Sequence, residues 1–396
     1  MPQQLKYFLL LLIMLLSVDV GYDLVEVNYL RTEIETITIT SKSLNSVYET
    51  NSDVNYYSSV KKDLTDNTVH ESLSTLAPQN ISGLGNDIDS NTLNKNAPTI
   101  DNESKKPKLT LLRVVFENDI FDNTDYYYTN GMRIELVANF IANTPTSKIL
   151  PTLNNSDYDF QGFSIVQNIY TPVNPDTKQI NNSDRPFSAY LTMGHFRNSY
   201  NIEKGLTMKS EFSVGVLGPA SLGGRVQSSI HEIEPVGWEN QIENDIVIDY
   251  SFLMEKAFLR KKHLEASAIA GARVGTVYNN LSTGLSVRTG FFLPVLDNQL
   301  PGLLKFDSEK LKFWVFVRAK LQFVVYDATL QGGIFNNSSF YVLKAEDLNR
   351  IVINASAGFA LYHKNVGIEF ENFYLSPEFK GAYDFRYGRI NFVISL

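Results

Sequence analysis

Apolar and polar residues alternate along the chain from Leu109 to the C-terminus, in segments of about ten residues. Residues 132–140 and 206–216 follow this pattern closely, and residues 246–254 and 264–274 repeat it. A period of two places successive side chains on opposite faces of a β-strand. About ten residues is longer than a typical strand of a soluble protein and matches a tilted strand that crosses a membrane. The pattern therefore predicts membrane-spanning β-strands.

The chain carries about twelve such segments, and an even number of antiparallel strands closes a barrel with both termini at one end. Closure also removes the sheet edges, whose unpaired backbone groups lipid cannot satisfy. We therefore expect an all-β fold: a closed antiparallel transmembrane β-barrel of about twelve strands, with a short helix in an extracellular loop. A large soluble β-sandwich or a lipocalin-like domain is the alternative. The expected strands are residues 109–118, 131–141, 159–170, 188–198, 205–217, 244–256, 264–277, 283–293, 312–326, 350–362, 365–375 and 386–396.

Aromatic residues lie near several of the predicted strand ends, namely Tyr126–Tyr128, Trp238, Tyr374 and Tyr387. Such positions are typical of the aromatic girdles that outer-membrane barrels place at both membrane interfaces. We expect these side chains to form girdles of that kind.

The N-terminal part of the chain has a different character. Lys6 precedes the apolar run Tyr7–Leu16, which predicts a secretory signal peptide over residues 1–21, with an uncleaved anchor as the alternative. Residues 22–108 are rich in Ser, Thr, Asn and Asp and show no sustained hydrophobic period, so we expect a disordered polar extension. The outer-membrane β-barrel with its extracellular loops then occupies residues 109–396.

Composition excludes several functions. The formal net charge of −8 argues against nucleic-acid binding, which would need a basic face. The absence of cysteine removes disulfides, thiol nucleophiles and thiolate metal sites together.

The polar clusters fall on one end of the expected barrel. If the N-terminal end is periplasmic, every odd-numbered connection faces outward, and the first three of these hold nearly all of the chemically interesting residues. These outward connections are residues 119–130, 171–187, 218–243, 278–282, 327–349 and 376–385.

The first of these loops is rich in side chains that carry oxygen: Asn118, Asp119, Asp122, Asn123, Asp125, Thr129 and Asn130. Oxygen ligands of this kind suit a hard cation, although an ordinary polar loop has the same composition. Asn118 and Asp119 are adjacent, so in a regular strand they would face opposite sides. They can serve one site directly only if the strand ends between them.

The third loop predicts a short helix over residues 221–234, ended by Pro235. Helical spacing places Gln227, His231 and Glu234 on one face. A histidine beside a carboxylate is the minimum set for a general base, and a solvated polar face is the alternative.

Several ordered motifs within residues 112–245 resemble the outer-membrane lipid A 3′-O-deacylases. The resemblance implies a twelve-stranded barrel with its site between the wall and a loop helix, which hydrolyses the ester carrying the 3′-linked acyloxyacyl group in a calcium-dependent reaction. The motifs are Glu117-Asn118-Asp119, residues 124–131, Gln167 to Pro172, Asp184 to Tyr190, Gly215 to Pro219, Val226-Gln227 with His231, Gly237-Trp238 and Gln241 to Asn244.

By motif position, the resemblance assigns catalytic roles to Asn118, Asp119, Thr129 and His231. The family's glutamate falls on either Glu232 or Glu234, and helical spacing favours Glu234. In the implied reaction, His231 takes a proton from water. Ca²⁺ held by Asp119, Asn118, Thr129 and Glu234, with Glu232 as a substitute, stabilises the oxyanion.

Further residues are expected to bind the substrate, namely Lys178, Arg185, Arg225 and Gln227. The expected protein is a monomeric hydrolase in the bacterial outer membrane that acts on the lipid A of lipopolysaccharide. The alternatives are a barrel without catalysis, serving as a pore or surface scaffold, and an outer-membrane phospholipase.

Overall fold

The computed structural model describes residues 110–119, 126–175, 181–230, 236–292 and 311–395, except for the side chains of Ser229 and Ile230. The signal peptide predicted at 1–21 and the polar extension predicted at 22–108 lie outside these residues. No helix of the described part is both long and apolar enough to cross a bilayer.

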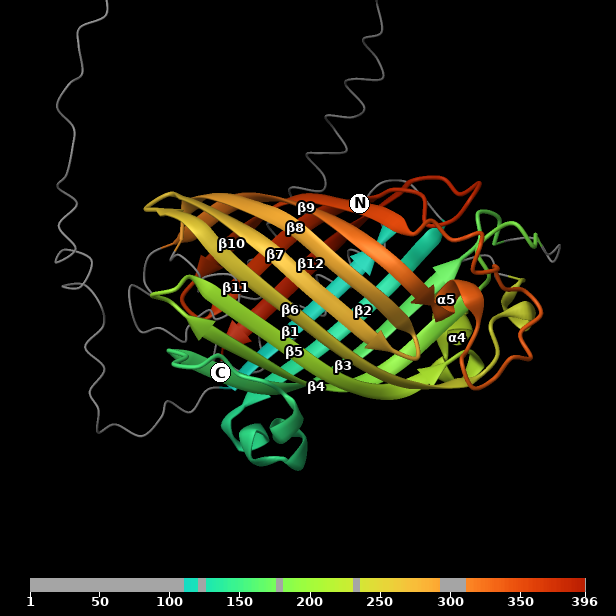
Figure 1. Cartoon of the computed structure of the whole chain (residues 1–396), viewed down its shortest axis with the longest axis horizontal. Coiled ribbons are helices and arrows are strands. Elements are labelled where there is room, and N and C mark those ends of the chain that lie inside the picture. The colour runs from blue at the N-terminus through green and yellow to red at the C-terminus, as the bar shows by residue number, and fades with distance from the viewer. Residues whose placement is uncertain (1–109, 120–125, 176–180, 231–235, 293–310, 396) are drawn as a thin grey trace, which may run out of the picture. The chain divides into compact units, whose positions relative to one another are not determined.

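Twelve antiparallel strands form a closed barrel, in which each strand pairs with its sequence neighbours and β12 pairs with β1 (Figure 1). The strands are β1 (Thr110–Asn118), β2 (Tyr127–Ala138), β3 (Tyr158–Thr171), β4 (Ser188–Asn201), β5 (Leu206–Leu217), β6 (Asp245–Lys261), β7 (Leu264–Gly275), β8 (Tyr278–Phe291), β9 (Lys312–Asp327), β10 (Ile351–His363), β11 (Val366–Leu375) and β12 (Phe385–Ser395). The short helices are η2 (Asn139–Asn143), η3 (Pro145–Ile149), η4 (Pro219–Ser221), α4 (Gly223–Ile230), η5 (Trp238–Asn240) and α5 (Ala328–Gln331). The fold class expected from the alternation is confirmed.

Several predicted strand ends differ from the structure, and two of these differences change the loops. β2 begins at Tyr127, so that Thr129 and Asn130 lie in a strand and not in the loop. β8 begins at Tyr278, which leaves a tight connection where a loop over 278–282 was expected. In both places buried tyrosines extend the strand, because their rings pack inside the barrel.

The outer wall is apolar. Along most strands, outward-facing residues with exposed aliphatic or aromatic side chains alternate with residues that face the lumen. Examples are Met132, Leu136, Ile165, Met193, Val214, Ile246, Ile248, Leu281, Leu285, Val315, Val317, Leu321, Phe323 and Phe359. This surface suits the hydrocarbon of a membrane.

The lumen is polar and balanced in charge. It holds a cavity of about 540 Å³ lined by seven cationic and seven anionic side chains. These are Arg113, Arg133, Lys209, Arg273, Arg318, Lys320 and Arg389 with Glu117, Glu135, Glu211, Asp249, Glu255, Glu369 and Glu371. Ion pairs such as Arg113–Glu135, with a nitrogen–oxygen distance of 2.7 Å, connect neighbouring strands.

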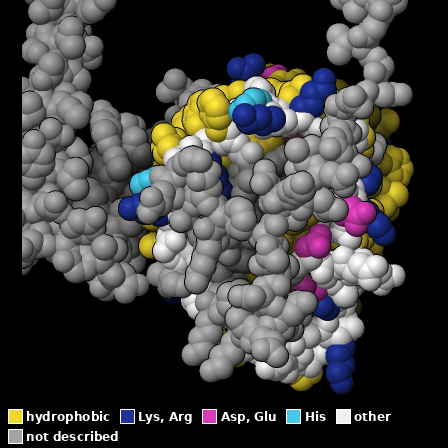
Figure 2. Space-filling view, turned by 90° about the vertical axis from the view of Figure 1, so that its left-hand side faces the viewer, with side chains coloured by type: hydrophobic (Ala, Val, Ile, Leu, Met, Phe, Trp, Pro, Cys, Tyr) yellow, Lys and Arg dark blue, Asp and Glu magenta, His cyan; other side chains and the backbone are white. Residues whose placement is uncertain are grey.

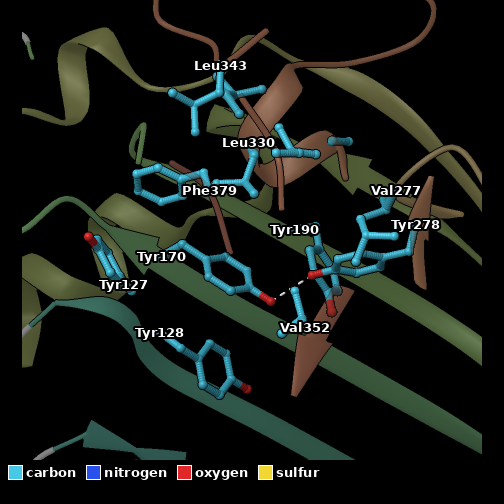
Figure 3. Close-up of a cluster of buried hydrophobic side chains, with 14 of the residues drawn as sticks. Tyr127, Tyr128, Tyr170, Tyr190, Val277, Tyr278, Leu330, Leu343, Val352 and Phe379 are labelled. Atoms are coloured by element: carbon cyan, nitrogen blue, oxygen red, sulfur yellow. Dashed lines mark hydrogen bonds between the residues drawn. The ribbon is translucent and has the colours of Figure 1, made fainter. Parts of the chain in front are cut away.

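An apolar cap fills the lumen at the end where α4 and α5 lie (Figure 3). Its tyrosines point inward from different strands, and the hydroxyls of Tyr170 and Tyr278 are 2.7 Å apart. Leu330 of α5 and Phe379 pack into the same cluster. The cap therefore separates the polar cavity from the loop end.

The cap overturns part of the girdle prediction. Tyr127, Tyr128 and Tyr387 are buried in the cap, and Trp238 is buried against Phe187. The cause at Tyr128 is a β-bulge between Tyr128 and Asn130, which turns the ring to the inner face.

The opposite end carries the tight turns β6–β7 and β10–β11. Figure 2 shows Lys, Arg and His side chains at this rim, with hydrophobic side chains on the flank beside them. Most connections at the α4 end are long, apart from the tight β7–β8 connection, and long connections are typical of the extracellular end of outer-membrane barrels, so the end with α4 is taken as extracellular.

Candidate functional site

The site begins where β1 ends. Asn118 is the last residue of β1. Because Arg113, Val115 and Glu117 line the lumen, alternation along the strand directs the Asn118 side chain outward. The strand has ended by Asp119, so the pleat no longer forces the two side chains onto opposite faces. Both residues are buried, and the Asp119 carboxylate accepts a hydrogen bond of 3.1 Å from the backbone N–H of Tyr126.

Thr129 joins this end of β1 through the β-bulge in β2. Tyr128 and Asn130 pair with consecutive residues of β3, so Thr129 is the additional residue of the bulge. Its hydroxyl lies 2.7 Å from the hydroxyl of Thr171, and both side chains are buried. Asn130 is the direct cross-strand partner of Asn118. Thr129, the residue before Asn130, therefore lies near the end of β1.

Helix α4 packs against the outer wall next to these residues. A Cβ atom on Gly223 would lie 2.2 Å from Cβ of Ala189, so the helix backbone approaches β4 as closely as glycine allows. Gln167 of β3, on the outward register, donates a hydrogen bond of 2.6 Å to the carbonyl oxygen of Ser221. These contacts fix the N-terminal end of α4 to β3 and β4.

Gln227 lies on the same stripe of α4 as Gly223, one turn further along. Its amide oxygen accepts a hydrogen bond of 3.0 Å from the indole nitrogen of Trp238. Its amide nitrogen is buried and has no hydrogen-bond partner in the described part of the chain. Trp238 in turn packs on Phe187, with ring centroids 5.1 Å apart.

The remaining predicted residues lie in different places. His231, Glu232, Glu234 and Lys178 lie outside the described residues. Arg225 is exposed on α4.

Arg185 is buried at the capped end of the lumen. Its guanidinium forms an ion pair with Glu378, donates a hydrogen bond of 3.1 Å to the Thr329 hydroxyl and stacks 4.5 Å from the centre of the Tyr170 ring. Burial alone would lower the pKa of this guanidinium, but Glu378 and Asp327 outweigh burial and raise the pKa. Arg185 thus binds three extracellular connections together, and its role in substrate binding stays a prediction.

Sequence reasoning missed Gln167 and Thr171 as members of this cluster. Both stand among the outward-facing residues of β3, where Ile165 is exposed to the lipid side. A polar side chain within a lipid-facing series was the available signal.

The donor set suits a hard cation. One carboxylate, one amide and one hydroxyl come from Asp119, Asn118 and Thr129, and calcium prefers oxygen ligands of these kinds. Among the described residues, no three His, Asp or Glu side chains gather closely enough to bind a metal ion. A cation here would therefore take amide and hydroxyl oxygens besides the carboxylate of Asp119.

The apolar wall and the capped lumen define a class: an outer-membrane β-barrel, here with a buried polar cluster outside its lumen. The family described as outer membrane protein LpxR matches residues 92–396. The chain belongs to the LpxR family and is an outer-membrane protein. Membership implies an outer-membrane hydrolase of the lipid A deacylase type.

One solved structure supports the fold, and two others show weaker likeness. LpxR from Salmonella typhimurium is 21% identical, with a TM-score of 0.58, over 72% of this chain and 99% of that chain. The β domain of the Bordetella autotransporter BrkA is 10% identical, with a TM-score of 0.39, over 72% and 98% of the two chains. The KdgM porin is 8% identical, with a TM-score of 0.30, over 73% and 99%. No curated protein matches the chain.

Proposed function

We propose that the chain hydrolyses the ester that links the 3′-acyloxyacyl group to lipid A, and that it uses a histidine-activated water and Ca²⁺. The observation that carries this proposal is the place of the polar cluster. Asn118, Thr129 and Thr171 lie buried on the outward register of an apolar wall, beside a helix that packs on that wall. Burying polar groups on a lipid-facing surface is costly, so their presence there favours a functional site.

An outward site suits a substrate that diffuses within the outer leaflet. Lipid A can reach the wall laterally, with its acyl chains remaining in the hydrocarbon, whereas a site in the lumen would require its extraction. The apolar cap also fills the loop end of the lumen, which argues against the pore alternative.

His231 is the proposed general base. It follows Gln227 by four residues, the spacing of one helical turn, and Gln227 belongs to the stripe of α4 that contains the wall contact Gly223. In its neutral form the imidazole accepts a proton from water, which attacks the ester carbonyl. Glu234, or Glu232 in its place, orients the imidazole or binds the cation.

Asp119, Asn118 and Thr129 are the proposed cation ligands on the wall. Bound Ca²⁺ supplies positive charge to the oxyanion that forms from the ester carbonyl. Lys178, Arg225 and Gln227 are the proposed substrate-binding residues, whereas Arg185, buried in the cap, would act only by holding the extracellular connections in place.

The test is the mass spectrum of lipid A from a host without this activity that carries the chain in its outer membrane. Loss of one acyloxyacyl unit with the wild type, and its retention with His231→Ala, is expected. Ser228→Ala, at an exposed position of the same helix, is the matched control and should behave as wild type. Heat-modifiable electrophoretic mobility shows that each barrel is folded.

Three other results would contradict the proposal. An unchanged spectrum with folded wild type and added calcium would favour a barrel without catalysis. Release of fatty acid from glycerophospholipid, with lipid A intact, would favour the phospholipase. Activity that survives complete chelation of calcium would remove the cation from the reaction.

A further inference from the structure

The connection between β2 and β3, residues 139–157, is long although it lies at the end of the barrel that carries tight turns. It contains η2 and η3, which lie outside the barrel beside the wall (Figure 1). By comparison, the β6–β7 and β10–β11 strand pairs at this end are joined by about two residues each. The β8–β9 connection at this end, residues 292–311, is also long, so length alone does not assign a role to residues 139–157; their contacts with the wall do.

The outer wall beneath this connection is polar, unlike the rest of the wall. Asp159 and Gln161 on β3 and His195, Arg197 and Ser199 on β4 all stand on the outward register, opposite to the lumen-facing Thr192 and Phe196. The first of them on β4, His195, lies two residues, or about 7 Å, from the lipid-exposed Met193. Bare side chains of this kind would be unfavourable against hydrocarbon.

The connection provides hydrogen-bond partners for several of these side chains, although Nε2 of His195 has none in the described part of the chain. The Thr146 hydroxyl lies 2.6 Å from Nδ1 of His195, and the Ser147 hydroxyl donates a hydrogen bond of 2.7 Å to Gln161. The Arg197 guanidinium donates a hydrogen bond of 3.0 Å to the Leu150 carbonyl oxygen. As a result His195 and Gln161 are only 4% and 7% exposed.

The same segment also exposes two large apolar side chains, beside the exposed Asn139, Asn143 and Lys148. Ile141 and Leu150 are buried, whereas their chain neighbours Phe140 and Ile149 are 65% and 50% exposed. At a similar distance from a turn, Phe258 on β6 is 64% exposed and belongs to the apolar wall. The exposed pair therefore adds apolar surface over the part of the wall that is polar.

We propose that residues 139–150 form a membrane-interface element, whose polar face binds the outer wall of β3 and β4 and whose Phe140 and Ile149 contact the acyl chains of the leaflet at the turn end. The partner is phospholipid, because the element is continuous with the lipid-facing wall. The proposal does not depend on the reaction that the protein catalyses.

The absence of cysteine allows a direct test. Phe140→Cys and Ile149→Cys proteins, labelled with a nitroxide and reconstituted into phosphatidylethanolamine–phosphatidylglycerol vesicles, report their depth by collision with oxygen and with a water-soluble nickel complex. Val317→Cys on the exposed wall is the lipid reference, and Lys262→Cys on the β6–β7 turn is the water reference. Lipids labelled in the headgroup calibrate the phosphate level.

Both labels are expected on the hydrocarbon side of the phosphates. A depth on the aqueous side for both would overturn the lipid contact and favour a soluble partner or no partner. Arg197→Met tests the docking, because it removes the hydrogen bond to Leu150. It should increase the mobility of the Phe140→Cys label and leave Val317→Cys unchanged, and unchanged mobility at both positions would contradict the docking contact.

Discussion

Replacing Gly223 by alanine is expected to move α4 off the barrel wall. The added methyl carbon would lie 2.2 Å from Cβ of Ala189. Carbon atoms in contact prefer about 3.5–4.0 Å, so the helix must shift by about 1.3–1.8 Å. Alanine is itself the better helix former, so the change does not weaken α4 from within.

A shift of this size should lower kcat/KM for lipid A deacylation by about 100-fold, because a misplacement of about 1 Å is enough to disrupt a catalytic geometry. The barrel itself should fold normally, since the clash lies outside its wall. The assay is deacylation in mixed micelles, followed by mass spectrometry, with heat-modifiable mobility as the test of folding.

The reciprocal change provides the control. Ala189→Gly removes the methyl group that Gly223→Ala would meet, and the next nearest atom, Cγ1 of Ile169, is at an ordinary 3.5 Å. The double variant should therefore recover most of the activity. Full activity of Gly223→Ala alone, or no recovery in a folded double variant, would refute the steric explanation.

Three further outcomes are expected. Asp119→Asn should reduce deacylation by about 100-fold or more in a folded barrel, because it removes the one described carboxylate of the cluster, and near-normal turnover would exclude its role. Arg185→Met should lower the free energy of unfolding in urea by about 1.5–3 kcal/mol, because it removes the charged partner of Glu378; an unchanged midpoint would show that the pair contributes little. Tyr278→Phe should cost about 0.5–1.5 kcal/mol, since it removes the hydrogen bond with Tyr170, and a more stable variant would contradict this.

The strands could be predicted because each follows a local rule. Alternation along β5 and β12 depends only on which face of the pleat a side chain occupies, so period and length were sufficient. The helix in the third loop could be anticipated from composition and spacing, and the structure describes its first part as α4.

Whether each tyrosine side chain points into the lumen or outward could not be predicted, because it depends on pairing between strands. Without a bulge Tyr128 would share the outward register of Met132, as a girdle residue should. The one-residue bulge at Thr129 reverses it, and no local feature of the sequence marks that bulge. Tyr387 is different. It lies two residues before the lumen-facing Arg389, so alternation along the strand places its side chain in the lumen as well.

The close approach of α4 to the wall is likewise a tertiary property. In the sequence, Gly223 resembles an ordinary turn residue, and only the folded structure shows that it lies against Ala189. The sequence identified the polar residues of the first loop. Only the pairing register of β1 with β2 shows that Asn118 and Asn130 are neighbours.

The pairing of β12 with β1 places the candidate site at the seam of the barrel. Asn118 is held opposite Gly388, and the adjacent Glu117 forms an ion pair with Arg389. The pairing of β12 therefore fixes the end of β1, and the wall around Asn118 is complete only when the seam closes. It follows that the polypeptide in transit to its membrane carries an unfinished site. Hydrolytic activity would then report completed assembly, and the cell would be spared an active lipid hydrolase in the wrong compartment.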